Sequence, residues 1–481
     1  MVKPKATSPF FFFLLFLHIF IIANGVHSFH EKKLFNVQML QRKQQLGTRS
    51  CFLPESRQEK GTVILEMKER DHCSQKKIDW NKRLQKQLIL DDINVHSMQN
   101  RIRRTISSHI VEASETQIPL TSGINLQTLN YIVSIGLGSQ NMTVIVDTGS
   151  DLTWIQCEPC MSCYNQQGPI FNPSTSSSYK PILCNSSTCQ SLQSATGNRG
   201  TCDASNSSSC NYVVNYGDGS YTNGELGLEH LVFGGISVSS FVFGCGRNNK
   251  GLFGGVSGLM GLGRSYLSMI SQTNATFGGV FSYCLPTIES GGSGSLVMGN
   301  NESSSVFKNV TPIAYTNMVL NPQLSNFYIL NLTGIDVGGV ALKSTSFGNG
   351  GMLIDSGTVI TRLVPSVYKA LKEEFLKQFS GYPSAPGFSL LDTCFNLTGN
   401  EEVSIPTIRL HFEDNAEMNV DVAGILYIVK DDASQVCLAL ASLNDESDIG
   451  IVGNYQQRNQ RVIYDTKDSK VGFASEPCSF I

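Results

Sequence analysis

The sequence has little that could hold a metal ion or activate a serine nucleophile. Of the eight histidines in 481 residues, only His230 and His411 follow residue 115, and neither lies in an HxxxH pattern. Zinc proteases take their ligands from such patterns, so zinc-dependent hydrolysis is excluded. No GxSxG motif is present, and two histidines leave little room for a Ser-His-Asp triad. We therefore expect no metal and no cofactor, and a structural or surface role for each histidine.

Long apolar runs are also scarce. The one extended run, residues 10–23, follows Lys3 and Lys5 and precedes small residues at Gly25 and Ser28. This is the pattern of a secretory signal peptide, here predicted over residues 1–28. A membrane helix needs about 20 apolar residues, so we expect no membrane span in the mature protein.

Cysteine, by contrast, is frequent in this chain. Twelve of the fourteen cysteines follow residue 156, and an even count in an exported protein predicts disulfides of open connectivity. The CxxCxxC spacing at residues 157–163 is also compatible with a metal or iron–sulfur site, but export favours disulfides. The candidates are Cys157, Cys160, Cys163, Cys184, Cys189, Cys202, Cys210, Cys245, Cys284, Cys394, Cys437 and Cys478.

Eight N-glycosylation sequons agree with export. They begin at Asn141, Asn185, Asn206, Asn274, Asn301, Asn309, Asn331 and Asn396. We expect a secreted, extracellular (apoplastic) protein, with the vacuole as the alternative destination.

Residues 29–115 differ from the remainder in charge. They carry 17 basic and 11 acidic residues, whereas residues 116–481 carry 17 basic and 28 acidic ones. Residues 41–104 have helical character and end in Arg101-Ile102-Arg103-Arg104, a processing region. A basic leader on an acidic body predicts a propeptide that inhibits its own protein, with the mature N-terminus at residues 105–121. A solvated tail is the alternative.

From about residue 116 the pattern is one of short strands and turns. The 44 glycines, mixed with Val, Ile, Phe and Ser, predict an all-β fold. We divide it into an N-terminal lobe of residues 116–310 with a Cys-rich insertion and a C-terminal lobe of residues 311–481.

Two copies of one motif carry the chemistry. Asp147-Thr148-Gly149-Ser150 and Asp355-Ser356-Gly357-Thr358 are 208 residues apart, and each follows an apolar run typical of a buried strand. In each copy, Gly lets the chain turn sharply and leaves the Asp at a loop tip. We expect the two carboxyl groups to face each other and share one proton, because both cannot ionise at close range.

An apolar, glycine-rich element follows each motif, at residues 258–263 and 449–453. This weak internal repeat predicts two related lobes. Between the first motif and the first such element, Asp218-Gly219 in the run Tyr216-Gly217-Asp218-Gly219-Ser220 predicts a hairpin.

A shared-proton aspartate pair predicts peptide hydrolysis by activated water at acid pH. One carboxylate takes a proton from water while the other carboxyl group stabilises the gem-diol. A glycosidase also uses two carboxyl groups, but the repeated Asp-Thr/Ser-Gly context does not predict one.

These motifs resemble the pepsin-like aspartic proteases across residues 120–481, in the plant nepenthesin-like group and its chloroplast-nucleoid-DNA-binding-protein-like branch. Residues 147–154, the Cys-rich insertion, the hairpin, residues 355–358 and the run Gly453-Asn454-Tyr455-Gln456-Gln457 carry the resemblance. It implies a bilobal fold with a central cleft that binds an extended peptide.

The resemblance also implies residue roles. Asp147 and Asp355 form the dyad, Thr148 and Ser356 cross-brace the loops, and Ser150 and Thr358 hydrogen-bond the carboxylates, with Gly149 and Gly357 between them. Tyr216 is the flap tyrosine, followed by Gly217 and Asp218, and Trp154 is its hydrogen-bond partner.

Two other functions remain open. Some plant relatives lose an aspartate and inhibit cell-wall glycoside hydrolases, and the branch name suggests a plastid nucleoid DNA-binding protease. Both aspartates are present here, and the leader's basic charge is interspersed with acids, so we expect a monomeric secreted aspartic endopeptidase, made as a zymogen, with protein or peptide substrates and no nucleic-acid partner.

Overall fold

The computed structural model describes residues 30–37, 54–69, 80–107, 131–202, 209–216, 219–251, 253–287, 293–299, 312–344, 347 and 351–478. The expected signal peptide, Gly217, Asp218 and the sequons at Asn206, Asn301 and Asn309 lie outside these residues.

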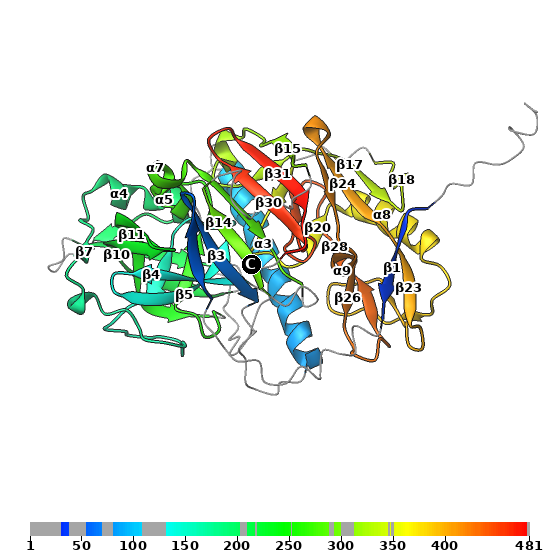
Figure 1. The fold of residues 1–481 in the computed structure, drawn as a ribbon, viewed down its shortest axis with the longest axis horizontal. Coiled ribbons are helices and arrows are strands. Elements are labelled where there is room, and N and C mark those ends of the chain that lie inside the picture. The colour runs from blue at the N-terminus through cyan, green and yellow to red at the C-terminus, as the bar shows by residue number, and fades with distance from the viewer. Residues whose placement is uncertain are drawn as a thin grey trace, which may run out of the picture.

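One continuous sheet joins the N-terminal half to the middle of the molecule (Figure 1). Its strands run in the order β15 (Ala314–Asn317), β31 (Lys470–Ser475), β30 (Gln460–Asp465), β13 (Val280–Cys284), β14 (Ser293–Met298), β3 (Thr62–Glu69), β4 (Tyr131–Leu137), β5 (Gln140–Asp147), β12 (Gly258–Gly261), β6 (Trp154–Gln156), β11 (Ile236–Lys250), β10 (Tyr221–Phe233), β9 (Cys210–Asn215) and β8 (Thr201–Cys202). At its sides, β2 (Ser56–Glu59) pairs with β3, and β7 (Lys180–Pro181) pairs with β10.

The C-terminal half is built from smaller sheets. Their orders are β16 (Ile329–Leu330), β19 (Met352–Ile354), β29 (Gly450–Val452), β20 (Thr361–Leu363), β28 (Leu440–Ser442); β18 (Val340–Ala341), β17 (Leu332–Val337), β24 (Ile408–Phe412), β25 (Glu417–Asn419); and β21 (Ser384–Ala385), β22 (Cys394–Phe395), β27 (Val436–Leu438), β26 (Leu426–Ile428). A separate pair joins β1 (Lys32–Asn36) to β23 (Glu402–Pro406).

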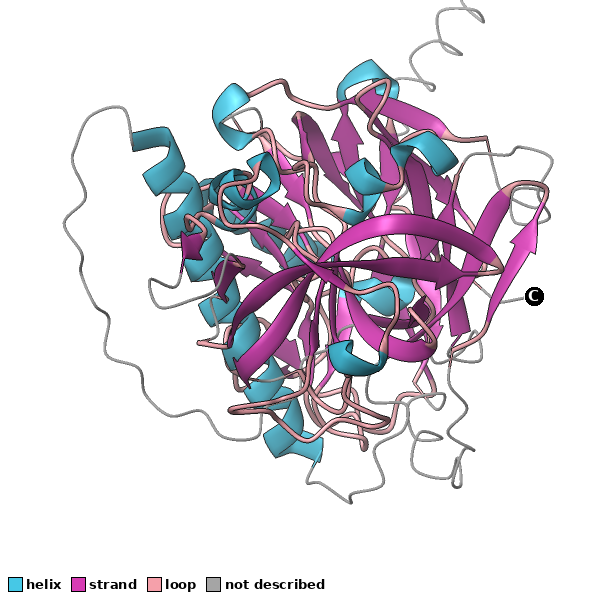
Figure 2. Ribbon diagram, turned by 90° about the vertical axis from the view of Figure 1, so that its left-hand side faces the viewer, coloured by secondary structure: helices cyan, strands magenta, loops and turns pink. Residues whose placement is uncertain are grey.

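In the residues that the structure describes, α-helices are few beside the strands (Figure 2). They are α3 (Trp80–Ser107), α4 (Ser187–Gln190), α5 (Leu192–Thr196), α6 (Met269–Gln272), α7 (Asn274–Phe277), α8 (Pro365–Gln378) and α9 (Val422–Ile425). The predominance of strands confirms the all-β prediction, and the strands gather into two lobes joined by the central sheet (Figure 1). One apolar core runs through both lobes and includes Val144, Phe281, Ile354 and Leu410.

The leader contains more than the predicted helix. Helix α3 agrees with the helical character expected up to residue 104, but residues 56–69 form the hairpin β2–β3. The expectation of helix there was wrong, because β3 pairs with β14 and β4 of the body, and such distant partners leave no local signal. The leader therefore contributes strands to the sheets as well as a helix.

Candidate functional site

The first motif begins where β5 ends, at Asp147. Strand β5 lies parallel to β12, which pairs Asp147 with Gly261 and holds the loop from behind. The Asp147 carboxylate accepts hydrogen bonds from the Gly149 amide at 2.9 Å and from Ser150 Oγ at 2.5 Å. One oxygen is thus bound by backbone and the other by a hydroxyl group.

The second motif repeats this arrangement after β19. Strand β19 lies parallel to β29, as β5 does to β12. The Asp355 carboxylate accepts from the Gly357 amide at 2.9 Å and from Thr358 Oγ1 at 2.6 Å. Both apolar, glycine-rich elements therefore back an aspartate loop, which confirms the internal repeat.

The two loops are tied to each other by their second residues. The Thr148 amide donates to Ser356 Oγ at 3.1 Å, and the Ser356 amide donates to Thr148 Oγ1 at 2.9 Å. Thr148 and Ser356 are both buried. These reciprocal bonds place two loops from opposite lobes in one fixed geometry.

The glycines of both motifs are needed for space. Neither Gly149 nor Gly357 has a positive φ, so the sharp turn expected from the sequence is not the reason for glycine. A Cβ on Gly149 would lie 2.8 Å from Asp355 Oδ1, and one on Gly357 would lie 2.5 Å from Asp147 Oδ1. Each glycine therefore makes room for the carboxylate of the opposite loop.

Burial favours the protonated forms of this pair. It raises the pKa of Asp147, against the hydrogen bonds from Ser150 and Gly149. Burial and then the charge of Asp147 raise the pKa of Asp355 to about 6. Two adjacent carboxyl groups with raised pKa values can hold one proton between them in weak acid.

The hairpin β9–β10 belongs to the N-terminal lobe, and its strands pair Asn215 with Tyr221, as the turn signal predicts. Tyr216 follows β9, and its hydroxyl accepts a hydrogen bond from Trp154 Nε1 at 2.7 Å. Phe253 packs edge-on against Trp154 with ring centroids 4.7 Å apart. Tyr216 and the dyad line the same cavity.

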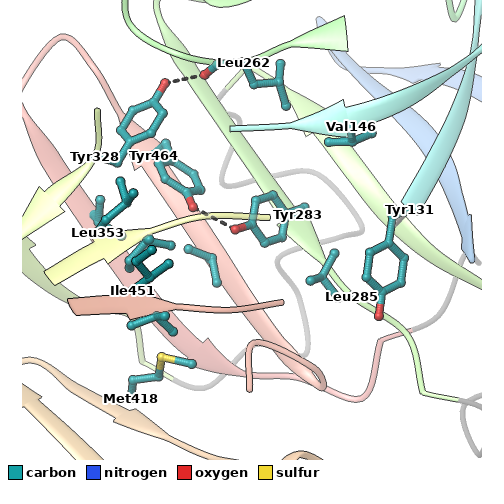
Figure 3. Close-up of a cluster of buried hydrophobic side chains, with 14 of the residues drawn as sticks. Tyr131, Val146, Leu262, Tyr283, Leu285, Tyr328, Leu353, Met418, Ile451 and Tyr464 are labelled. Carbon is teal, nitrogen blue, oxygen red and sulfur yellow. Dashed lines mark hydrogen bonds between the residues drawn. The ribbon is translucent and has the colours of Figure 1, made fainter. Parts of the chain in front are cut away.

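Residues behind the aspartates carry a polar network to which the sequence analysis assigned no role. Gln457 donates to the carbonyl oxygens of Asp355 at 3.2 Å and Val452 at 2.8 Å and accepts from the Tyr283 hydroxyl. The Tyr283 and Tyr464 hydroxyl groups are 2.7 Å apart (Figure 3). Asn454 donates to the Ser356 carbonyl at 3.0 Å. Residues 453–457 carry the family resemblance, and the sequence signal for their structural role is an amide-rich run that follows an apolar strand.

Helix α3 of the leader lies between the two lobes, against this site (Figure 1). One series of its buried side chains recurs every three or four residues: Leu84, Leu88, Asp91, Val95, Met98 and Ile102. This spacing places them on one face of a helix. Asp91 accepts from the amides of Val359 at 2.5 Å and Ile360 at 3.1 Å, and it pairs with Arg362 at 2.8 Å. Both Asp91 and Arg362 have side chains only 1% exposed.

Further contacts hold the C-terminal part of α3. Gln99 exchanges hydrogen bonds with the backbone of Ile449, donating at 2.6 Å and accepting at 3.1 Å. Arg101 donates to the Gly149 carbonyl at 3.0 Å, and its guanidinium group lies 4.8 Å from the centre of the Phe327 ring. A cavity of about 130 Å³ remains between α3 and the dyad. That volume is well below the roughly 300–1,000 Å³ of ordinary ligand pockets, so the helix fills the cleft.

The twelve candidate cysteines form six disulfides. The pairs are Cys157–Cys245, Cys160–Cys163, Cys184–Cys202, Cys189–Cys210, Cys284–Cys478 and Cys394–Cys437. This pairing excludes a metal site at residues 157–163. Within the described ranges no group of three or more His, Cys, Asp or Glu side chains could hold a metal ion.

The two body histidines lie outside the aspartate site. His411 pairs with Asp336 at 2.9 Å and Glu417 at 3.3 Å, and His230 is exposed. In the part of the chain that the structure covers, no helix has the length and apolar character to cross a membrane.

Comparison with known proteins agrees with this geometry. The chain matches the families described as Xylanase inhibitor N-terminal, over residues 131–300, and Xylanase inhibitor C-terminal, over residues 327–475. An aspartyl protease family protein of Arabidopsis thaliana is 45% identical over 399 residues, which are 82% of each chain. Aspartic proteinase nepenthesin-1 of Nepenthes gracilis is 37% identical over 357 residues, 72% of this chain and 77% of that protein.

Among solved structures, basic 7S globulin from soybean has a TM-score of 0.56 at 20% identity and covers 73% of this chain and 94% of its own. At that identity the likeness concerns the fold alone.

Proposed function

Because this chain belongs to the pepsin-like aspartic protease family, in its plant nepenthesin-like group, we propose that it is an aspartic endopeptidase. One observation carries the proposal: Asp147 and Asp355 lie on matched, cross-braced loops with equivalent hydrogen bonds. A protein that only binds partners does not need two carboxyl groups that are hydrogen-bonded in equivalent ways and face each other.

In the proposed reaction, a water molecule lies between the two carboxyl groups. Asp147 acts as general base and removes a proton from the water, whose oxygen attacks the peptide carbonyl carbon. Protonated Asp355, whose pKa is raised by burial and by Asp147, donates to the developing oxyanion. Asp147 then donates the proton it took from water to the amide nitrogen, Asp355 takes a proton back from the gem-diol, and the C–N bond breaks to give an amine and a carboxylic acid. The apparent pKa values belong to the pair, and the two residues exchange roles as the proton moves.

The same proposal includes synthesis as a zymogen. Leader residues 29–115 follow a signal peptide of residues 1–28, and α3 fills the cleft that an extended substrate would need. The body would then comprise lobes at residues 116–310 and 311–481. We propose that the cut at residues 105–121 is autocatalytic at acid pH.

Protein substrates follow from the homology to proteases. The disulfides and the likeness to nepenthesin-1 indicate a secretory-pathway protein. We propose an extracellular destination, with the vacuole as the alternative. Glycans at the exposed side chains of Asn141, Asn185 and Asn274 would be compatible with either one.

The family descriptions favour one second candidate, inhibition of a cell-wall glycoside hydrolase, since both name a xylanase inhibitor. Hydrolysis of a mixed peptide library between pH 3 and 7, beside Asp147→Ala and a pepstatin-treated sample, separates the two. Acid cleavage that is lost in both controls supports the protease. No cleavage by folded, leader-free protein rejects it, and capture of a xylanase would then support the inhibitor.

A further inference from the structure

Strand β23 at the outer edge of the C-terminal lobe depends on the leader for its pairing. Among the described strands it pairs only with β1, antiparallel, from Lys32↔Pro406 to Asn36↔Glu402. Backbone bonds continue past both ends: the Val37 amide donates to the Glu401 carbonyl at 2.8 Å, and the Thr407 amide donates to the Glu31 carbonyl at 3.0 Å. Without β1, the backbone edge of β23 would be open.

Side chains of β1 also complete the core of the lobe. Phe35 is 5% exposed and Val37 is 2% exposed, and both belong to the same apolar cluster as Val403 and Ile405 of β23. Leu34, which points to the other face, is 65% exposed. This alternation is that of a strand with one face in the core. Removing β1 would therefore uncover apolar surface as well as backbone.

Polar contacts fix the register of β1. Glu31 Oε2 lies 3.1 Å from Arg409 Nη2, and Lys32 Nζ donates to the Gln378 carbonyl at 2.8 Å. A one-residue slip would turn Phe35 and Val37 outward and separate these pairs. The segment is thus recognised by backbone, apolar and charged groups together.

The position of β1 differs from that of α3. Helix α3 lies between the lobes, whereas β1 lies at the outer margin of the C-terminal lobe beside β23 (Figure 1). An active protease needs α3 to leave, because α3 fills the cleft beside the dyad. It does not need β1 to leave.

We propose that residues 30–37 stay bound to the C-terminal lobe after the leader is cut, as a non-covalent strand of the mature protein. The mode of binding is strand addition, with a segment of this chain as its own partner. This proposal rests on the proposed function in one respect, which is that the leader is cut. The test therefore cuts the leader with an added protease, whose action does not depend on Asp147 and Asp355.

For the test, a site for a sequence-specific protease is inserted between Gln45 and Leu46 of the full chain, in wild-type and Asp147→Ala backgrounds. The N-terminal fragment ends at Gln45 and contains no cysteine, because the first cysteine of the chain is Cys51, so no disulfide can hold the fragment to the body. After cutting and gel filtration, mass spectrometry should find the fragment with residues 30–37 in the body fraction at one copy per body. After acid processing of the wild type, it should remain there while α3 peptides are lost.

Elution of the fragment away from the folded body would overturn the proposal. Phe35→Ser in the cut chain should release the fragment, whereas Leu34→Ser should retain it. Since a polar side chain at a buried position can also hinder folding, amide exchange of residues 402–406 is followed in the unmutated protein before and after the cut. Exchange should stay slow. Faster exchange after the cut would contradict retention of the fragment. Slow exchange without the fragment in the body fraction would also contradict it, because another segment would then have paired with β23. Lack of peptidase activity would leave these outcomes unaffected.

Discussion

Thr148 and Ser356 each donate a backbone amide to the other's side-chain oxygen across the boundary between the lobes, at 3.1 Å and 2.9 Å. Both residues are buried, so water cannot replace either bond. The relative position of the two aspartates is therefore determined by contacts between lobes and not within either one.

Replacing Thr148 by Val keeps the shape of the side chain but removes the acceptor for the Ser356 amide. A buried donor without a partner costs about 1–3 kcal/mol, so we expect a lower melting temperature and a lower kcat/KM on a cleavable peptide. Thermal unfolding and steady-state hydrolysis measure the two effects. Thr175→Val, at an exposed position, is the control. Equal melting temperatures for the two variants would show that the reciprocal bonds stabilise nothing.

Much of the site could be predicted because its signals are local. A buried apolar run followed by Asp-Thr-Gly or Asp-Ser-Gly specifies a strand that ends in a loop, and two copies specify two such loops. The Asp-Gly hairpin is equally local, and Tyr216 and Trp154 meet as the resemblance implied. Why glycine is needed at positions 149 and 357 could not be predicted, because a larger side chain would collide with the carboxylate of the opposite loop and the turn itself does not require glycine.

The contacts of the leader with the rest of the chain could not be predicted, because they join residues that are far apart in the sequence. The pattern at residues 84–102 indicates an apolar helix face, but nothing nearby shows that Asp91 meets Arg362, 271 positions later. Strand β1 pairs with residues about 370 positions away. A short strand has little stability of its own, so only its distant partner determines that it forms.

The pH dependence follows from the raised pKa of Asp355, about 6 against an ordinary 3.8. The proton is needed for catalysis, so kcat/KM of leader-free enzyme should fall as pH rises through about 6. Because the folded-state pKa lies above the unfolded one, the contribution to stability is complete below about pH 4 and is lost as pH rises through 6. The melting temperature of the wild type should thus decline between pH 4 and 7 more than that of Asp355→Asn. Parallel declines would refute a raised pKa at this position.

Asp91 should keep α3 in the cleft. Asp91→Ala removes the nearer of the two carboxylates that pair with the buried Arg362, and breaking a buried pair costs about 3–5 kcal/mol. We expect the uncut full chain to hydrolyse a small peptide faster than the uncut wild type, with gels confirming that neither has been processed. Asp92→Ala is the matched control, since the Asp92 side chain is 46% exposed and 3.7 Å from Arg362. If both variants are as inactive as the wild type before cutting, Asp91 does not hold the helix in place.

Tyr216→Phe should lower kcat/KM. It removes the acceptor for Trp154 Nε1, whose side chain is fully buried. A loss of about 1.4 kcal/mol in the transition state would lower kcat/KM about tenfold. Tyr266→Phe, on a side chain that is 68% exposed, should change nothing. Equal kcat/KM values in the two variants would show that the Trp154–Tyr216 hydrogen bond does not contribute to catalysis.

The proposed activation of water by Asp147 and Asp355 together is tested most directly by measuring kcat/KM of leader-free Asp147→Asn and Asp355→Asn at pH 4. Each change keeps the side-chain shape but removes a group that must carry or accept the proton. We expect kcat/KM to fall by at least about a thousandfold in either variant, with melting temperatures showing that both remain folded. Activity within about tenfold of the wild type in either folded variant would contradict the shared-proton dyad.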